Sequence, residues 1–298
     1  MALTICIVHD KFQPGFPHSI DLNTMPYRRS TLILTVAQCA LLAAAASSSG
    51  CGTTPSIGSG LNQADVNGQA RDYILQLPDN YDSSNPYKLV IGYHWLDGSM
   101  DTVVDGSFYG LAPLAADSTI FVAPQGLNAG WANTNGDDLT FTDQILDAVQ
   151  SNFCIDQDRI FATGWSYGGA MSYSVACSRA DVFRAVAVMS GAELSGCDGG
   201  SDPIAYFGQH GISDDVLPID SGRQLRDHFV GVNGCDAADP EEPAPGSGTH
   251  STTDYTGCSE GHPVEWVAFD GGHVPTPSDA GSSDSFTPGL IWDFFSQF

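Results

Sequence analysis

The sequence is poor in basic residues. Its 298 residues include 10 Lys and Arg against 35 Asp and Glu, which gives a formal net charge of −25 at pH 7. A surface this acidic repels nucleic acids, anionic membranes and polyanionic substrates, so we expect none of these as partners. No Asn-x-Ser/Thr sequon occurs anywhere in the chain, and N-glycosylation is therefore not expected.

Metal-binding patterns and long apolar runs are missing as well. No Cys-x-x-Cys pair or Cys/His cluster has the spacing of a zinc site, so we expect neither a metal nor another cofactor. The apolar stretch in residues 30–42 is shorter than the roughly 20 residues that span a bilayer. It is preceded by two arginines and followed by small residues, an order typical of a secretory signal peptide.

This pattern divides the chain into three parts. We interpret residues 25–50 as the signal peptide, which predicts a secreted, extracellular protein. A signal peptide begins a chain, so we expect Met25 to be the true start. Residues 1–24 are then an extension of the gene model or a stretch that is not translated. Residues 51–298 form the mature protein, long enough for one domain.

The mature part contains six of the eight cysteines. An even number of cysteines in an exported chain predicts three disulfides. We expect Cys235 to pair with Cys258, because this bond would close the polar loop between them. Six cysteines allow 15 pairing patterns, and the sequence leaves the other two bonds open.

Strand-like and helix-like segments alternate along residues 51–298, which predicts an α/β fold. The sheet is expected to be mostly parallel and central, with helices on both faces, in a single domain. The predicted strands are 72–78, 88–95, 118–126, 159–165, 183–191, 203–211 and 264–271, and the predicted helices are 138–153, 168–179, 221–230 and 288–298.

A serine flanked by glycines lies at one predicted strand end. The segment Gly-Trp-Ser-Tyr-Gly-Gly places Ser166 after the strand 159–165 and before a helix that starts near Gly168. Active sites of open parallel sheets lie at the carboxyl ends of the strands. Flanking glycines permit the strained turn of a nucleophile elbow. The segment alone is equally compatible with a structural turn.

Two downstream residues favour catalysis. Asp214 and His273 each follow a later predicted strand, so an acid and an imidazole reach the same sheet edge as Ser166. An imidazole takes the serine proton, and a carboxylate fixes the imidazole tautomer. The order Ser, Asp, His is the one expected for an α/β-hydrolase fold. We predict that these three residues form a catalytic triad, and we prefer Asp214 to its neighbour Asp215.

The triad also requires donors for an oxyanion. We predict the backbone N–H of Tyr167, which follows the nucleophile, and that of Leu96, in the loop after the first buried strand. The N–H of Trp95 is the alternative, and His94 is expected to be a structural hydrogen-bonding residue. Trp95 and Trp131 are candidates to stack on a planar acyl group, although ordinary packing explains Trp131 equally well.

Four segments carry a resemblance to a known family. They are His-Trp-Leu-Asp-Gly-Ser from His94, Gly-Trp-Ser-Tyr-Gly-Gly from Gly164, His-Gly-Ile-Ser-Asp-Asp-Val-Leu-Pro from His210 and Asp-Gly-Gly-His-Val-Pro-Thr-Pro from Asp270. Across residues 51–298 the chain resembles the fungal secreted feruloyl esterases of carbohydrate esterase family 1. The resemblance implies a serine esterase that removes feruloyl groups from plant cell-wall polysaccharides such as feruloylated arabinoxylan or pectin fragments. We expect a monomer.

Other functions share these motifs. Acetylxylan esterases and extracellular polyhydroxybutyrate depolymerases belong to the same wider group, and the triad does not separate them. A non-catalytic wall-binding protein on a hydrolase scaffold is a further alternative. The complete triad argues against it.

Overall fold

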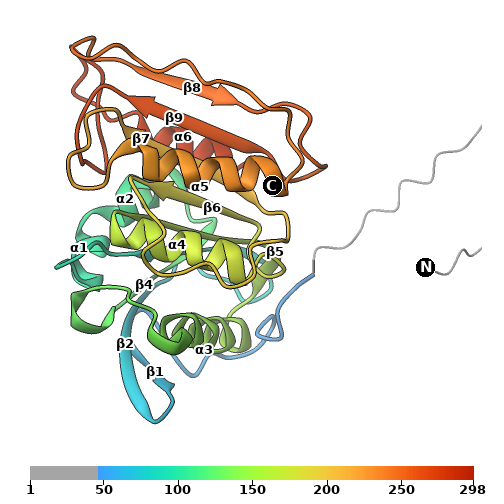
Figure 1. Ribbon diagram of the computed structural model, residues 1–298. Coiled ribbons are helices and arrows are strands. Elements are labelled where there is room, and N and C mark those ends of the chain that lie inside the picture. The colour runs from blue at the N-terminus through green and yellow to red at the C-terminus, as the bar shows by residue number, and fades with distance from the viewer. Residues whose placement is uncertain (1–45) are drawn as a thin grey trace, which may run out of the picture. The chain divides into compact units, whose positions relative to one another are not determined.

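A nine-stranded sheet crosses the part of the chain that the computed structural model describes, residues 46–298 (Figure 1). The strand order is β1-β2-β4-β3-β5-β6-β7-β9-β8. Pairing is parallel from β4 through β3, β5, β6 and β7 to β9, and antiparallel for β1, β2 and β8. The strands are β1 (Gly60–Val66), β2 (Gln69–Gln76), β3 (Tyr87–Tyr93), β4 (Thr119–Pro124), β5 (Ile155–Trp165), β6 (Ala185–Met189), β7 (Ala205–Gly211), β8 (His250–Asp254) and β9 (Val264–Phe269).

The central strands are largely buried and mostly apolar because both faces of the sheet are covered. On β3, Leu89 and Ile91 pack into one core cluster, whereas Val90 packs into the other. The same alternation separates Ile120 from Phe121 on β4. Each of these two strands therefore contributes to two cores, one under each layer of helices.

Helices α3, α4 and α5 cover one face of the sheet, and α1, α2 and α6 lie on the other (Figure 1). The helices are α1 (Met100–Asp105), α2 (Ser107–Gly110), α3 (Asp137–Asn152), α4 (Tyr167–Ser178), α5 (Ile219–Val232) and α6 (Thr287–Phe295), with 3-10 turns at Ala112–Leu114, Leu127–Ala129 and Thr134–Gly136. The expected mostly parallel sheet with helices on both faces is confirmed.

Every predicted strand and helix is present, and within residues 46–298 two short strands and two short α-helices were not predicted. Strand β8 lies within the polar loop between Cys235 and Cys258, and its side chains are half-buried or exposed, so no apolar pattern marks it. Helix α1 has six residues and begins at a capping box formed by Ser99 and Thr102. The remaining two are β1, an edge strand with four of its seven residues exposed, and the four-residue α2.

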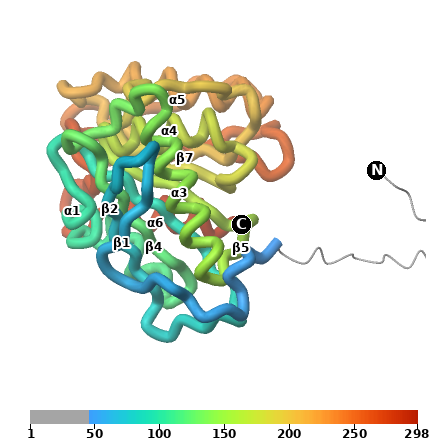
Figure 2. The backbone as a smooth tube through the Cα atoms, turned by 90° about the horizontal axis from the view of Figure 1, so that it is seen from below, coloured from blue at the N-terminus to red at the C-terminus, as the bar shows by residue number. Residues whose placement is uncertain are grey.

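The first described residues pack on the domain (Figure 2). Ser47 pairs with Asp156 at the start of β5. The Ser48 hydroxyl donates to the carbonyl of Phe153 at 2.6 Å and accepts from the Ile155 N–H at 2.8 Å. The folded domain therefore includes residues 46–50, which the sequence assigned to the signal peptide. The rest of that segment, and the proposed extension, lie outside the described residues.

Three disulfides join the six cysteines of residues 46–298: Cys51–Cys154, Cys177–Cys197 and Cys235–Cys258. The predicted pairing of Cys235 with Cys258 is confirmed. Within residues 46–298, no helix combines the length and apolar character needed to cross a membrane.

Candidate active site

Ser166 occupies a sharp turn between β5 and α4. Its backbone has φ 58° and ψ −119°, a positive φ that costs a non-glycine residue on the order of 1–3 kcal/mol. The turn is held on one side by the Ser166 N–H, which donates to the Met189 carbonyl of β6 at 2.9 Å. The serine therefore projects from the carboxyl edge of the sheet.

The glycines beside Ser166 are needed for close packing. A Cβ at Gly168 would lie 2.1 Å from the carbonyl oxygen of Tyr93, and one at Gly164 would lie 2.4 Å from the carbonyl of Gly168. Both obstructions are backbone atoms, which cannot move aside as a flexible side chain can. The first turn of α4 consequently fits against the ends of β3 and β5 only when both positions lack a side chain.

The three predicted triad side chains meet at this edge. His273 Nε2 lies 2.8 Å from Ser166 Oγ, and His273 Nδ1 lies 2.7 Å from Asp214 Oδ2. The His273 side chain is 10% exposed and that of Asp214 is 0% exposed. The adjacent Asp215 is exposed and makes no such contact. The geometry therefore selects Asp214 over Asp215.

Asp214 is held as a buried carboxylate. Burial alone raises the pKa of Asp214, but hydrogen bonds from His210, His273 and the N–H groups of Leu217 and Val216 lower it below the usual range. Oδ1 accepts both backbone N–H groups at 2.9 Å. The acid is thus ionised and oriented toward the imidazole before any substrate arrives.

His210 is a neighbour of the triad that the sequence did not reveal. It is fully buried, and its Nε2 lies 3.3 Å from Asp214 Oδ2 and 2.7 Å from the Leu217 carbonyl oxygen. The spacing of four residues between His210 and Asp214 was the available signal, since both flank one tight turn.

The loop after β3 contains two backbone N–H groups that are free to donate. Its Asp97 N–H donates to the Ala129 carbonyl, and its Gly98 N–H donates to the Trp95 carbonyl. The N–H groups of Trp95 and Leu96 have no hydrogen-bond partner among the described residues. Tyr167, the first residue of α4, likewise has an N–H without an acceptor inside its helix.

His94 fixes this loop. Its buried ring donates from Nδ1 to the Trp95 carbonyl at 2.7 Å and accepts the Gly126 N–H on Nε2 at 2.9 Å. Burial lowers the pKa of His94, although the hydrogen bond to Trp95 opposes that effect. A neutral imidazole therefore links the loops after β3 and β4, in line with the expected structural role.

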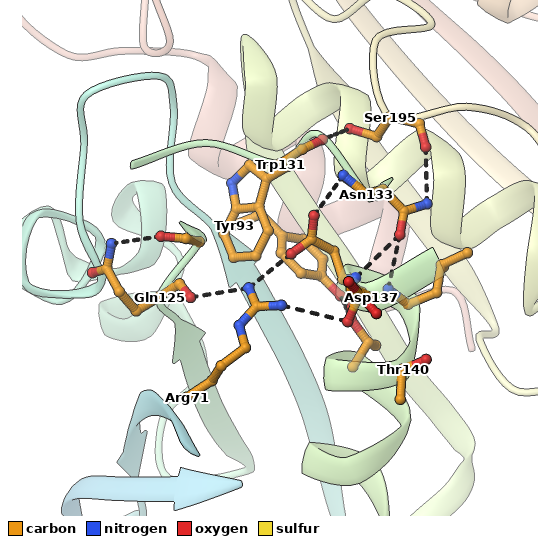
Figure 3. A network of polar contacts seen from close by, with 12 residues as sticks. Arg71, Tyr93, Gln125, Trp131, Asn133, Asp137, Thr140 and Ser195 are labelled. Atoms are coloured by element: carbon orange, nitrogen blue, oxygen red, sulfur yellow. Dashed lines mark hydrogen bonds and ion pairs between the residues drawn. The ribbon is translucent and has the colours of Figure 1, made fainter. Parts of the chain in front are cut away.

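A buried polar network holds the loop after β4 (Figure 3). Arg71 of β2 pairs with Asp138 of α3 at 2.7 Å and donates to the carbonyls of Gln125 and Asp137. The Asn133 N–H donates to Asp138 at 2.7 Å, and the Asn133 amide donates to the Ser195 carbonyl. The loop is thereby tied to β2, to α3 and to the segment after β6.

The two candidate tryptophans have different positions. Trp131 is 0% exposed, and its indole N–H donates to the His94 carbonyl at 2.7 Å. The prediction that it stacks on an acyl group is wrong, because its ring is a core side chain. Trp95 is only partly buried, and its ring lies 5.4 Å from that of Trp165, which in turn lies 4.8 Å from the His273 ring.

An apolar cavity opens beside these rings. It has a volume of about 360 Å³ and lies between α1, α2, the start of α6 and the loop that follows His273. Its lining includes Trp95, Val103, Tyr109, Pro275, Thr276 and Pro288.

The parallel sheet, the strained serine elbow and the Ser, Asp, His order define an α/β-hydrolase. A model of the prolyl oligopeptidase family matches residues 127–193, the part that contains the elbow. Two solved structures share the fold at 16% identity: an acetyl xylan esterase from Aspergillus awamori, with a TM-score of 0.54 over 80% of this chain and 99% of that one, and a ferulic acid esterase, with a TM-score of 0.53 over 74% and 92%.

Sequence relatives are much nearer. Feruloyl esterase C of Emericella nidulans is 52% identical over 254 residues, covering 84% of this chain and 91% of that protein. Feruloyl esterase D of Neurospora crassa is 50% identical over 279 residues, covering 90% and 96%. The chain belongs to the fungal feruloyl esterase family.

Proposed function

We propose that the protein is a secreted serine esterase that hydrolyses feruloyl esters of plant cell-wall polysaccharides. The observation that carries the proposal is the continuous relay from Ser166 through His273 to Asp214, with contacts of 2.8 and 2.7 Å. The family's activity on feruloyl esters supports the choice of acyl group. The three disulfides support an oxidising, extracellular location.

In the proposed mechanism Ser166 Oγ attacks the ester carbonyl while His273 Nε2 accepts the hydroxyl proton. The carboxylate of Asp214 stabilises the imidazolium that forms. His273 then gives this proton to the departing sugar oxygen, and an acyl-enzyme on Ser166 remains. Water then attacks the acyl-enzyme while His273 accepts its proton. The bond between the acyl carbon and Ser166 Oγ breaks, His273 returns the proton to Oγ, and the carboxylic acid leaves.

The oxyanion of each tetrahedral intermediate is assigned to the N–H groups of Tyr167 and Leu96, with Trp95 as the alternative donor. Removing a single donor of this kind costs about 10²–10³ in rate in other hydrolases. The turn at 95–98 supports the assignment, because it engages the N–H groups of Asp97 and Gly98 and leaves those of Trp95 and Leu96 without partners among the described residues.

The aromatic acid is assigned to the apolar cavity. Its volume of about 360 Å³ lies at the lower end of the range for small-molecule sites. Trp95 and Tyr109 provide aromatic surface, and Pro275 places one wall two residues from His273. An acetyl group would leave most of this space empty, so the cavity favours a cinnamoyl over an acetyl substrate.

The test is hydrolysis of methyl ferulate and 4-nitrophenyl acetate by the wild type and by Ser166→Ala. We expect at least a 10³-fold loss of kcat for both esters in the variant, as for other triad serines. Ser151→Ala, an exposed serine on α3, is the matched control and should retain full activity. Full activity of Ser166→Ala would refute the mechanism, and cleavage of the acetate ester alone would refute the feruloyl assignment.

A further inference from the structure

A second cavity lies at the active edge of the sheet, on the face opposite the apolar cavity. It has a volume of about 340 Å³ and is enclosed by the segment after β6 and by helices α4 and α5. Its lining includes Tyr173, Glu193, Leu194, Ser221, Gln224 and His228. We call it the polar groove.

Each wall of the polar groove starts at the catalytic machinery. Helix α4 begins at Tyr167, directly after the nucleophile. The segment after β6 begins beside it, since a Cβ at Gly169 would lie 3.3 Å from Gly191 Cα. Helix α5 begins at Ile219, two residues after Leu217, whose N–H is bonded to Asp214. The three elements that form the groove therefore begin beside the triad, and the groove lies further along α4 and α5.

The polar side chains of the groove have unused hydrogen-bonding capacity. The carboxylate of Glu193, the amide of Gln224 and the hydroxyl of Ser221 have no hydrogen-bond partner among residues 46–298. Together they offer acceptors and donors on one concave surface. Burial, and then the charge of Glu193, raises the pKa of Tyr173, which keeps that phenol protonated as a further donor.

The charge of the groove restricts the ligand. No Lys or Arg lines it, and Glu193 contributes a negative charge. A phosphate or a uronic acid would be repelled, whereas a neutral polyol presents hydroxyls that both donate and accept. The exposed side chain of Leu194 adds an apolar contact for the C–H surface of such a ligand.

A feruloyl ester has two chemically different halves joined at the carbonyl that Ser166 attacks. The apolar cavity suits the aromatic acid and does not suit a polyhydroxylated ring. We propose that the polar groove binds the neutral sugar whose hydroxyl carries the ester, with Glu193 and Gln224 as its main hydrogen-bonding residues. This assignment rests on the proposed function, since it names the alcohol side of the same reaction.

The test compares an ester that carries a sugar with one that does not. The double variant Glu193→Ala/Gln224→Ala is assayed on feruloylated arabinose and on methyl ferulate. We expect kcat/KM for feruloylated arabinose to fall about tenfold or more, as for the loss of two hydrogen bonds. For methyl ferulate it should stay within twofold of the wild type, which also shows that the variant is folded.

The matched control is Glu260→Ala/Gln297→Ala. It removes the same two side-chain types from exposed positions near the amino end of β9, at the opposite edge of the sheet. This control should leave both substrates unchanged. An equal loss on both substrates in the groove variant, or no loss on either, would overturn the sugar site. Failure of the wild type to cleave methyl ferulate would instead overturn the proposed function.

Discussion

The buried ion pair between Arg71 and Asp138 allows a test of how burial changes the contribution of an ion pair to the free energy of unfolding. Its side chains are 2% and 6% exposed, and the two charged groups are 2.7 Å apart. Replacing Asp138 with Asn leaves the guanidinium of Arg71 buried without a counter-charge, a change that costs about 3–5 kcal/mol in comparable sites. In the variant Arg71 still donates to two backbone carbonyls, and its guanidinium carbon lies 4.0 Å from the ring centroid of Phe141. We therefore expect the free energy of unfolding to fall by about 3 kcal/mol, at the lower end of that range.

The same helix provides the control. Asp143, also on α3, pairs with Arg179 at 2.7 Å, but these side chains are 38% and 28% exposed. Asp143→Asn should therefore cost about 1 kcal/mol or less. Both free energies of unfolding are measured by urea denaturation at pH 7, with tryptophan fluorescence as the signal. The loss for Asp143→Asn should shrink further in 1 M salt, while that for Asp138→Asn should not. Equal losses for the two variants would refute the reasoning.

Two further predictions concern a glycine and a buried carboxyl. Gly168→Ala places a Cβ against the Tyr93 carbonyl, so kcat/KM should fall about 100-fold through displacement of the elbow. The control Gly289→Ala, with open space on α6, should leave kcat/KM unchanged and stabilise the protein by about 0.5–1 kcal/mol in urea denaturation. The same change in kcat/KM for both variants would contradict the packing argument. Burial, with two nearby aspartates, raises the pKa of Glu265 to about 7. The folded state therefore keeps a proton that the unfolded chain loses near pH 4.5, and the free energy of unfolding falls as the pH rises between these two values. Glu265→Gln should be about 1–2 kcal/mol more stable than the wild type at pH 8 and no more stable at pH 4, and a pH-independent difference would contradict this origin.

Much of this architecture could be predicted because strong local patterns coincide with it. The buried strands are continuous apolar runs, and the serine, acid and imidazole each follow such a run, so the rule for parallel sheets brings them to one edge. Position within His-Gly-x-x-Asp and at a strand end distinguishes Asp214 from Asp215. The disulfide between Cys235 and Cys258 followed from the polar loop that it closes.

What could not be predicted depends on the direction of side chains and on contacts between distant segments. A tryptophan in a loop after a strand reaches either the substrate or the core, and Trp131 points into the core, where its indole N–H finds the His94 carbonyl. The contact of His210 with Asp214 could not be predicted, because it depends on how the turn between the two residues folds. Residues 46–50 are small and mostly polar, as in a cleavage region, and it is contacts with distant segments, such as the hydrogen bonds of Ser48 with Phe153 and Ile155, that include them in the domain.

The apolar cavity and the polar groove have no lining residue in common, and helices on opposite faces of the sheet form their walls. Because of this separation, directed evolution can change one cavity without changing the lining of the other. A library that varies residues 102–110 and 275–288 changes the lining of the apolar cavity, while residues 192–194 and 221–228, which line the polar groove, keep their native sequence. Gains selected independently in the two libraries should then combine additively, since the altered side chains do not touch one another.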